Sequence, residues 1–151
     1  MSQDFYLGNP NLKKVGTEIQ FTKEQIQEYL RCKEDPVYFA MNYIKIISLD
    51  EGIVPFKMWD FQQELIESFH ENRFNIAKLP RQTGKSTTCV SYLLHYILFN
   101  DNVNVGILAN KLSTARDLLG RLQLAYEQLP LWLQQGIVVY NKGSMELELS
   151  L

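Results

Sequence analysis

The order of apolar and polar segments between residues 74 and 127 constrains the fold more than any other feature of the sequence. Residues 74–79 (FNIAKL) are typical of a strand, residues 80–84 (PRQTG) of a loop, and residues 86–99 of a helix that is apolar on most sides. A second strand at 103–109 and a second helix at 113–127 repeat this order. Strands that alternate with helices of this length predict an α/β fold, with a parallel sheet covered by helices on both faces.

Shorter elements are predicted on both sides of this unit. Residues 1–21 form a polar arm, and helices are expected from Thr22, where Gln25 completes a capping box, from Asp35-Pro36, and over residues 60–70. Residues 44–56 indicate a hairpin or loop, and residues 137–140 and 145–149 indicate two strands around a turn. We therefore expect an arm and helical subregion at 1–57 and a core at 58–151, within one domain overall.

Composition excludes several classes of protein. Hydrophobic residues make up 46% and charged residues 21% of the chain, which is typical of a globular domain rather than a disordered or fibrous one. A net charge of -2 provides no overall basic field for nucleic acid or anionic membrane. The two cysteines form no C-x-x-C pair, and the longest apolar run is too short to span a bilayer. These features predict a soluble intracellular protein without a membrane partner.

Residues 80–87 carry the strongest chemical signal, because they place Gly84-Lys85-Ser86 between a predicted strand and a predicted helix. Backbone N–H groups at a helix start, together with the positive end of the helix dipole, bind phosphate. Gly84 allows the backbone to come close, Lys85 offers an ammonium to the β- and γ-phosphates of ATP, and the Ser86 hydroxyl can bind Mg²⁺.

Two observations weaken this signal when the loop is taken alone. A Gly-Lys-Ser tripeptide also arises by chance, and Leu79 stands where G-x-x-x-x-G-K-[ST] has its first glycine. Arg81 is either a solvated surface residue or a guanidinium that pairs with phosphate oxygens, and we favour a role in sensing the nucleotide.

The loop at 80–86 resembles the deviant phosphate-binding motif of large terminase subunits from T-even-like tailed phages, which lacks the first glycine and has an early arginine. The resemblance continues in order through residues 8–13, 38–40, 60–63, 105–111, 129–130, 136–138 and 141–144. It implies the ATPase motor that packages double-stranded DNA into a capsid, working in the host cytoplasm at the prohead portal. The portal, the small terminase subunit and DNA are the implied partners.

The resemblance also implies the residues of the site. Gln62 corresponds to a glutamine that recognises adenine, a task for which an amide that both donates and accepts is suited. The expected ATP-binding residues are Gln62, Arg81, Gln82, Thr83, Gly84, Lys85, Ser86 and Thr87, with Ser86 as the Mg²⁺ ligand.

The sequence departs from the family by ending before the expected Walker B strand, so we assign no catalytic residue and expect an incomplete P-loop NTPase-type sheet. Glu146 and Glu148 follow no long apolar run and are more typical of a half-exposed strand. ATP should therefore be bound but hydrolysed little, and unpaired strands at 103–109 and 137–149 should cause self-association. A small P-loop kinase and a non-catalytic interaction module with a vestigial loop are the competing hypotheses.

Overall fold

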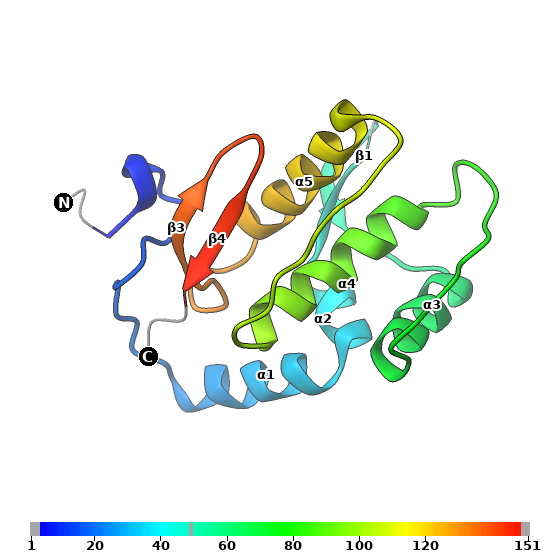
Figure 1. Cartoon of the computed structure of the whole chain (residues 1–151). Coiled ribbons are helices and arrows are strands. Elements are labelled where there is room, and N and C mark those ends of the chain that lie inside the picture. Colours follow the sequence, from blue (N-terminus) through cyan, green and yellow to red (C-terminus); the bar gives the residue numbers. More distant parts are fainter. Residues whose placement is uncertain (1–3, 49, 149–151) are drawn as a thin grey trace.

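The computed structural model describes residues 4–48 and 50–148, and within them the chain is a mixed α/β domain of five α-helices and two antiparallel strand pairs. A short 3₁₀ turn at Tyr6–Gly8 precedes the first helix. In Figure 1, helix α4 crosses the centre of the molecule, with α5 and the β3–β4 pair on one side of it and α3 on the other. Within the described part, no helix is both long enough and apolar enough to cross a membrane.

The N-terminal helices begin where the capping residues predict. Helix α1 spans Lys23–Glu34, and its capping box is formed by Gln25 N–H donating to Thr22 Oγ1 at 3.2 Å and Thr22 N–H donating to Gln25 Oε1 at 3.0 Å. Helix α2 spans Pro36–Tyr43, with Tyr38 N–H donating to the Asp35 carboxylate at 2.9 Å.

The remaining elements follow in the predicted order, except that the strands predicted at 74–79 and 103–109 are absent from the described chain. Strands β1 (Lys45–Ser48) and β2 (Gly52–Pro55) form an antiparallel hairpin, one of the two alternatives expected there, followed by α3 (Asp60–Glu71), α4 (Lys85–Phe99) and α5 (Leu112–Glu127). Strands β3 (Gly136–Tyr140) and β4 (Met145–Glu148) pair antiparallel around the predicted turn. Leu149, the last residue of the predicted second strand, lies outside the described residues.

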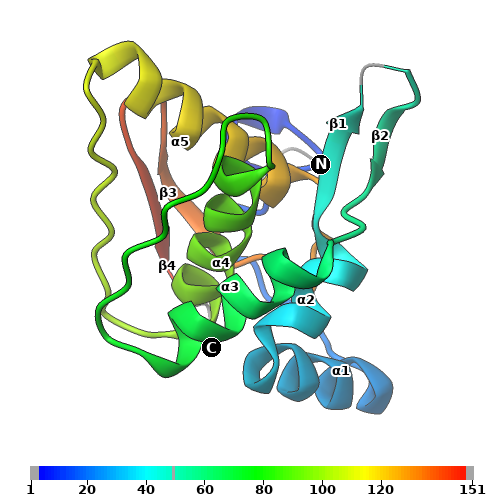
Figure 2. The ribbon, with the colours of Figure 1, turned by 90° about the vertical axis from the view of Figure 1, so that its right-hand side faces the viewer.

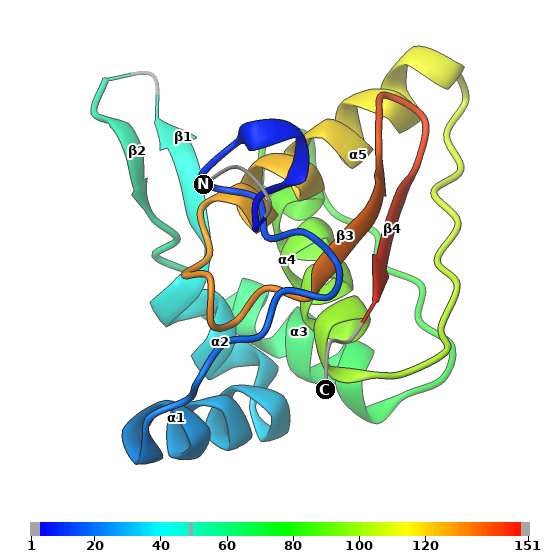
Figure 3. The same ribbon diagram turned by 90° about the vertical axis from the view of Figure 1, so that its left-hand side faces the viewer.

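The described residues do not form the predicted parallel sheet. Residues 74–79 and 103–109 are extended, but no backbone hydrogen bond joins either segment to another part of the described chain. Both segments run beside α4, on the same side of it and in the direction opposite to the helix (Figures 2 and 3). The two strands predicted there are therefore not formed, because a strand needs a paired neighbour that the described chain does not place beside either segment.

The two segments leave large apolar side chains in solvent. Phe74 is 83% exposed, Ile76 is fully exposed and Leu108 is 91% exposed. Residues 103, 105 and 107 are half-buried while 104, 106 and 108 are exposed, which is the period of two that a strand shows when one face is covered. Residues 103–108 therefore show the side-chain alternation of a strand, residues 74–78 are exposed throughout, and neither segment is paired within the described part of the chain.

One hydrophobic core joins the N-terminal helices to the rest of the chain. Helix α2 packs against both α3 and α4, with Phe39, Ile66, Leu94 and Leu98 buried where they meet. The expected division near residue 57 therefore crosses a shared core, consistent with one domain overall.

The N-terminal arm is tied to the other end of the chain. Lys13 N–H donates to Gln134 Oε1 at 3.0 Å, Ile137 N–H donates to the Lys13 carbonyl at 2.9 Å, and Lys14 bridges Ile137 in parallel. Gly136 has no room for a side chain, because a Cβ there would lie 2.4 Å from Val15 Cα. The arm thus forms a third partial strand on the inner edge of β3.

Candidate nucleotide-binding loop

The start of α4 presents backbone donors without partners. Gly84 is its N-cap and has φ 71° and ψ 15°, and no side chain caps the helix. The first backbone bond runs from Thr88 N–H to the Gly84 carbonyl at 3.0 Å. In the described part of the chain, the N–H groups of Lys85, Ser86 and Thr87 thus remain available to an anion, with the positive end of a helix dipole behind them.

The backbone before Gly84 is also unusual. Gln82 has φ 61°, a left-handed conformation that is uncommon for a residue with a side chain. The Thr83 hydroxyl donates to the Pro80 carbonyl at 3.0 Å and closes the turn. Positive φ angles two residues apart orient neighbouring N–H groups toward one side of a loop, the arrangement of anion-binding nests. Strain of this kind is concentrated at functional sites.

Gln62, on helix α3, supports the loop through a hydrogen bond. It is only 5% exposed; its Oε1 accepts from Trp59 N–H at 2.9 Å, and its Nε2 donates to the Thr83 carbonyl at 3.3 Å. A Cβ on Gly84 would lie 2.6 Å from Gln62 Nε2, so the loop rests directly on this amide. The structure therefore gives Gln62 a positioning role that the sequence did not predict, and its contact with adenine stays a prediction.

The remaining predicted residues surround the same helix start. Lys85 Nζ donates to the Leu79 carbonyl at 3.4 Å, so its side chain folds back over the loop. Arg81 and Gln82 are exposed, while Ser86 and Thr87 are half-buried. The structure therefore brings all of the predicted residues of 81–87 to one helix terminus, with Gln62 beneath it.

Thr88 is a contributor that sequence reasoning missed. Its side chain is fully buried, and its hydroxyl donates to the Gly84 carbonyl at 3.0 Å, which ties the first turn of α4 to the loop. A run of three hydroxyl residues after Lys85 is visible in the sequence, but nothing in it distinguishes the residue that anchors the loop.

The donor set fits a magnesium-bound triphosphate. Three unpartnered N–H groups, one ammonium and one hydroxyl converge on a terminus that carries no carboxylate in the first turn of its helix. Among residues 4–48 and 50–148, no group of three or more His, Cys, Asp or Glu side chains could hold a metal by itself. Mg²⁺ at this loop would therefore depend on phosphate oxygens together with the Ser86 hydroxyl.

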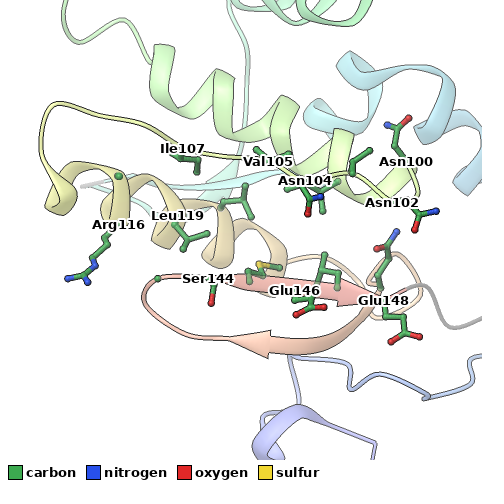
Figure 4. Close-up of a pocket in the computed structure, with 18 of the residues that line it drawn as sticks. Asn100, Asn102, Asn104, Val105, Ile107, Arg116, Leu119, Ser144, Glu146 and Glu148 are labelled. Atoms are coloured by element: carbon green, nitrogen blue, oxygen red, sulfur yellow. The ribbon is translucent and has the colours of Figure 1, made fainter.

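A large cavity lies away from this loop. It has a volume of about 900 Å³ and is enclosed by residues 97–107, α5 and the β3–β4 turn and strand β4 (Figure 4). No residue of the loop lines it, whereas Glu146 and Glu148 do. The structure thus places these two carboxylates around a different feature from the loop. No protein-family model matches the chain.

Proposed function

We propose that the chain binds ATP through the loop at 80–87 and that it is part of the ATPase motor of a phage terminase large subunit. The observation that supports this most is the helix start at Gly84, where left-handed backbone, unpartnered N–H groups and Lys85 occur together. The resemblance of the loop and of seven further stretches to that family supports the identity of the motor.

Each residue of the loop has a role in this proposal. Bound ATP supplies the phosphoanhydride bond whose hydrolysis powers packaging. The N–H groups of residues 85–87 hold phosphate oxygens, the Lys85 ammonium leaves the Leu79 carbonyl for the β- and γ-phosphates, and the Ser86 hydroxyl binds Mg²⁺. Arg81 is exposed beside them and senses the charge of the nucleotide.

The proposal includes a P-loop NTPase-type fold for the core. Residues 74–79 and 103–109 would be neighbours of further strands in a parallel sheet, with α4 as the crossover helix between them. Their extended backbone, their common direction and their position on one side of α4 support this assignment (Figure 2). Connections of this kind put the phosphate loop at the carboxyl end of the first strand, which is where residues 80–84 lie.

We further propose that this chain alone hydrolyses ATP slowly. Hydrolysis needs a group that orients or activates water, and it needs a carboxylate contact to Mg²⁺ in addition to the Ser86 hydroxyl. Neither Lys85 nor Ser86 provides these. Double-stranded DNA, the portal and the small terminase subunit are the proposed partners of the complete motor, and the family resemblance is their support.

Titration calorimetry with Mg-ATP tests the proposal. Binding should be detectable and should be lost in Lys85→Ala, because the ammonium is aimed at the phosphates. Lys78→Ala is the matched control, since it removes the same charge from an exposed position two residues before the loop. Equal affinity in the two variants would contradict the proposed site. Phosphate release at about one per second or faster, lost in Lys85→Ala, would contradict the slow hydrolysis.

A further inference from the structure

An exposed tryptophan stands at the start of the helix that supports the loop. Trp59 is the N-cap of α3, and its side chain is 73% exposed. Its indole contacts the ring of Phe61, with the two centroids 6.2 Å apart and the ring planes at 71°. A T-shaped neighbour covers at most one face of the indole, so a broad aromatic surface is left open to solvent. A nucleobase stacks on a surface of this kind.

Gln62 holds the backbone of Trp59 beside the phosphate loop. Trp59 N–H donates to Gln62 Oε1 at 2.9 Å, and Gln62 Nε2 donates to the Thr83 carbonyl at 3.3 Å. A Cβ on Gly84 would lie 2.6 Å from the same amide, so the first turn of α3 directly contacts the N-cap of α4. Helices α3 and α4 pack against each other (Figure 2). One amide group therefore joins Trp59 to the start of the phosphate-binding helix.

The fold uses the backbone of Trp59 rather than its indole. The hydrogen bond to Gln62 comes from the main chain, and the preceding residue, Met58, is the one that packs against the hydrophobic core. The indole is thus placed precisely at the helix start while most of its surface stays free for a ligand.

The first turn of α3 is a surface that the base of a bound nucleotide can reach. When the N–H groups of residues 85–87 hold the phosphates, the ribose and base extend beyond the loop onto the surface next to it. Gln62 offers little of that surface, because it is 5% exposed and already bonds two backbone groups. Trp59 offers an open ring.

We infer that the base of the bound nucleotide stacks on Trp59. This inference rests on the proposed binding of ATP at the loop, and it assigns the recognition of a nucleoside, as distinct from a bare triphosphate, to this one side chain. The loop holds the phosphates, Trp59 holds the base, and Gln62 keeps the two at a fixed separation. Stacking of a base on an aromatic side chain changes affinity by roughly five- to 150-fold.

Titration calorimetry with two ligands separates the base from the phosphates. Trp59→Ala should weaken the binding of Mg-ATP by about fivefold or more and leave that of Mg-tripolyphosphate, which has no base, unchanged. Trp59→Phe should retain most of the affinity for Mg-ATP, because a phenyl ring also stacks. Phe74→Ala is the matched control: it removes a ring that is 83% exposed at the far end of residues 74–79, and it should bind both ligands like the unmodified chain.

Tryptophan fluorescence gives an independent readout of the same contact. Trp132 is half-buried with its ring 5.8 Å from that of Tyr43, so Trp132→Phe keeps an aromatic ring there and leaves Trp59 as the only tryptophan of the chain. In this variant Mg-ATP should quench the emission, because the base covers the indole. Mg-tripolyphosphate should bind without quenching.

Four results would overturn the inference. Full affinity of Trp59→Ala for Mg-ATP would do so while leaving the loop as a phosphate site. Equal loss of both ligands in Trp59→Ala would show that the tryptophan supports the loop and not the base. Emission that responds to the concentration of the chain but not to Mg-ATP would assign the indole to a protein contact. An unmodified chain that binds neither ligand is a distinct result, because it would contradict the proposed nucleotide site itself and the inference with it.

Discussion

Replacing Gly84 with alanine tests how the loop is held. Gly84 has φ 71°, where an alanine pays roughly 1–2 kcal/mol relative to glycine. The new Cβ would also lie 2.6 Å from Gln62 Nε2, so the amide must move away from the Thr83 carbonyl that it bonds at 3.3 Å. Losing that hydrogen bond costs about 0.5–1.5 kcal/mol. We expect Gly84→Ala to lower the free energy of unfolding by roughly 1.5–3.5 kcal/mol in total.

Urea unfolding followed by circular dichroism measures this effect against a matched control. Gly52→Ala has almost the same strain, at φ 76°, but a Cβ there meets nothing within 4 Å. In a Gln62→Ala background, Gly84→Ala should cost only what Gly52→Ala costs, because the clash has been removed. If Gly84→Ala and Gly52→Ala are equally destabilising in the unmodified chain, then Gln62 does not support the loop as we describe.

Two further predictions concern the core and the arm. Burial lowers the pKa of His95 from 6.5 to about 4, with its Nε2 donating to the Cys32 carbonyl at 2.8 Å. The unfolded chain therefore takes up the proton first, and stability should fall by roughly 3 kcal/mol as pH drops from 6.5 to 4, with no effect above 6.5. Urea titrations should show this loss reduced in His95→Gln but retained in His70→Gln, and equal losses would contradict the assignment. Gly136→Ala should cost about 1–3 kcal/mol by pushing the arm off β3, whereas Gly120→Ala, with open space around it in α5, should stabilise by about 0.5–1 kcal/mol. Calorimetric midpoints that move in the same direction would contradict this contrast.

The sequence predicted those features of the fold that interactions between near neighbours in the chain determine. Thr22 with Gln25, and Asp35 with Pro36, mark the starts of α1 and α2 because the caps are bonds between residues at most three positions apart. The alternation of half-buried and exposed side chains at 103–107 matches the alternating pattern of the sequence there. Pairing within the predicted parallel sheet does not follow from local sequence, because it requires partners from distant parts of the chain, whereas the described pairs are antiparallel hairpins of strands that are neighbours in the sequence.

Part of the candidate site was likewise predictable from local sequence and part of it was not. The position of the loop before α4 was predictable from the order of strand, glycine and apolar helix. Gln62 lies 21 residues upstream of Thr83, and its bond to the Thr83 carbonyl depends on how α3 packs against α4. The left-handed backbone of Gln82 was also beyond the sequence, since glutamine has no preference for that conformation.

The most direct test of the central claim follows the backbone amides of the loop during a titration with Mg-ATP. In ¹⁵N-resolved NMR spectra, the amide signals of Lys85, Ser86 and Thr87 should shift most, since their N–H groups are those we assign to the phosphates. Tripolyphosphate should reproduce most of the shifts, and Lys85→Ala should abolish them at the same ligand concentration. Signals that stay fixed at residues 85–87, while those of residues 103–107 or 145–148 move, would contradict the assignment of the loop as the nucleotide site.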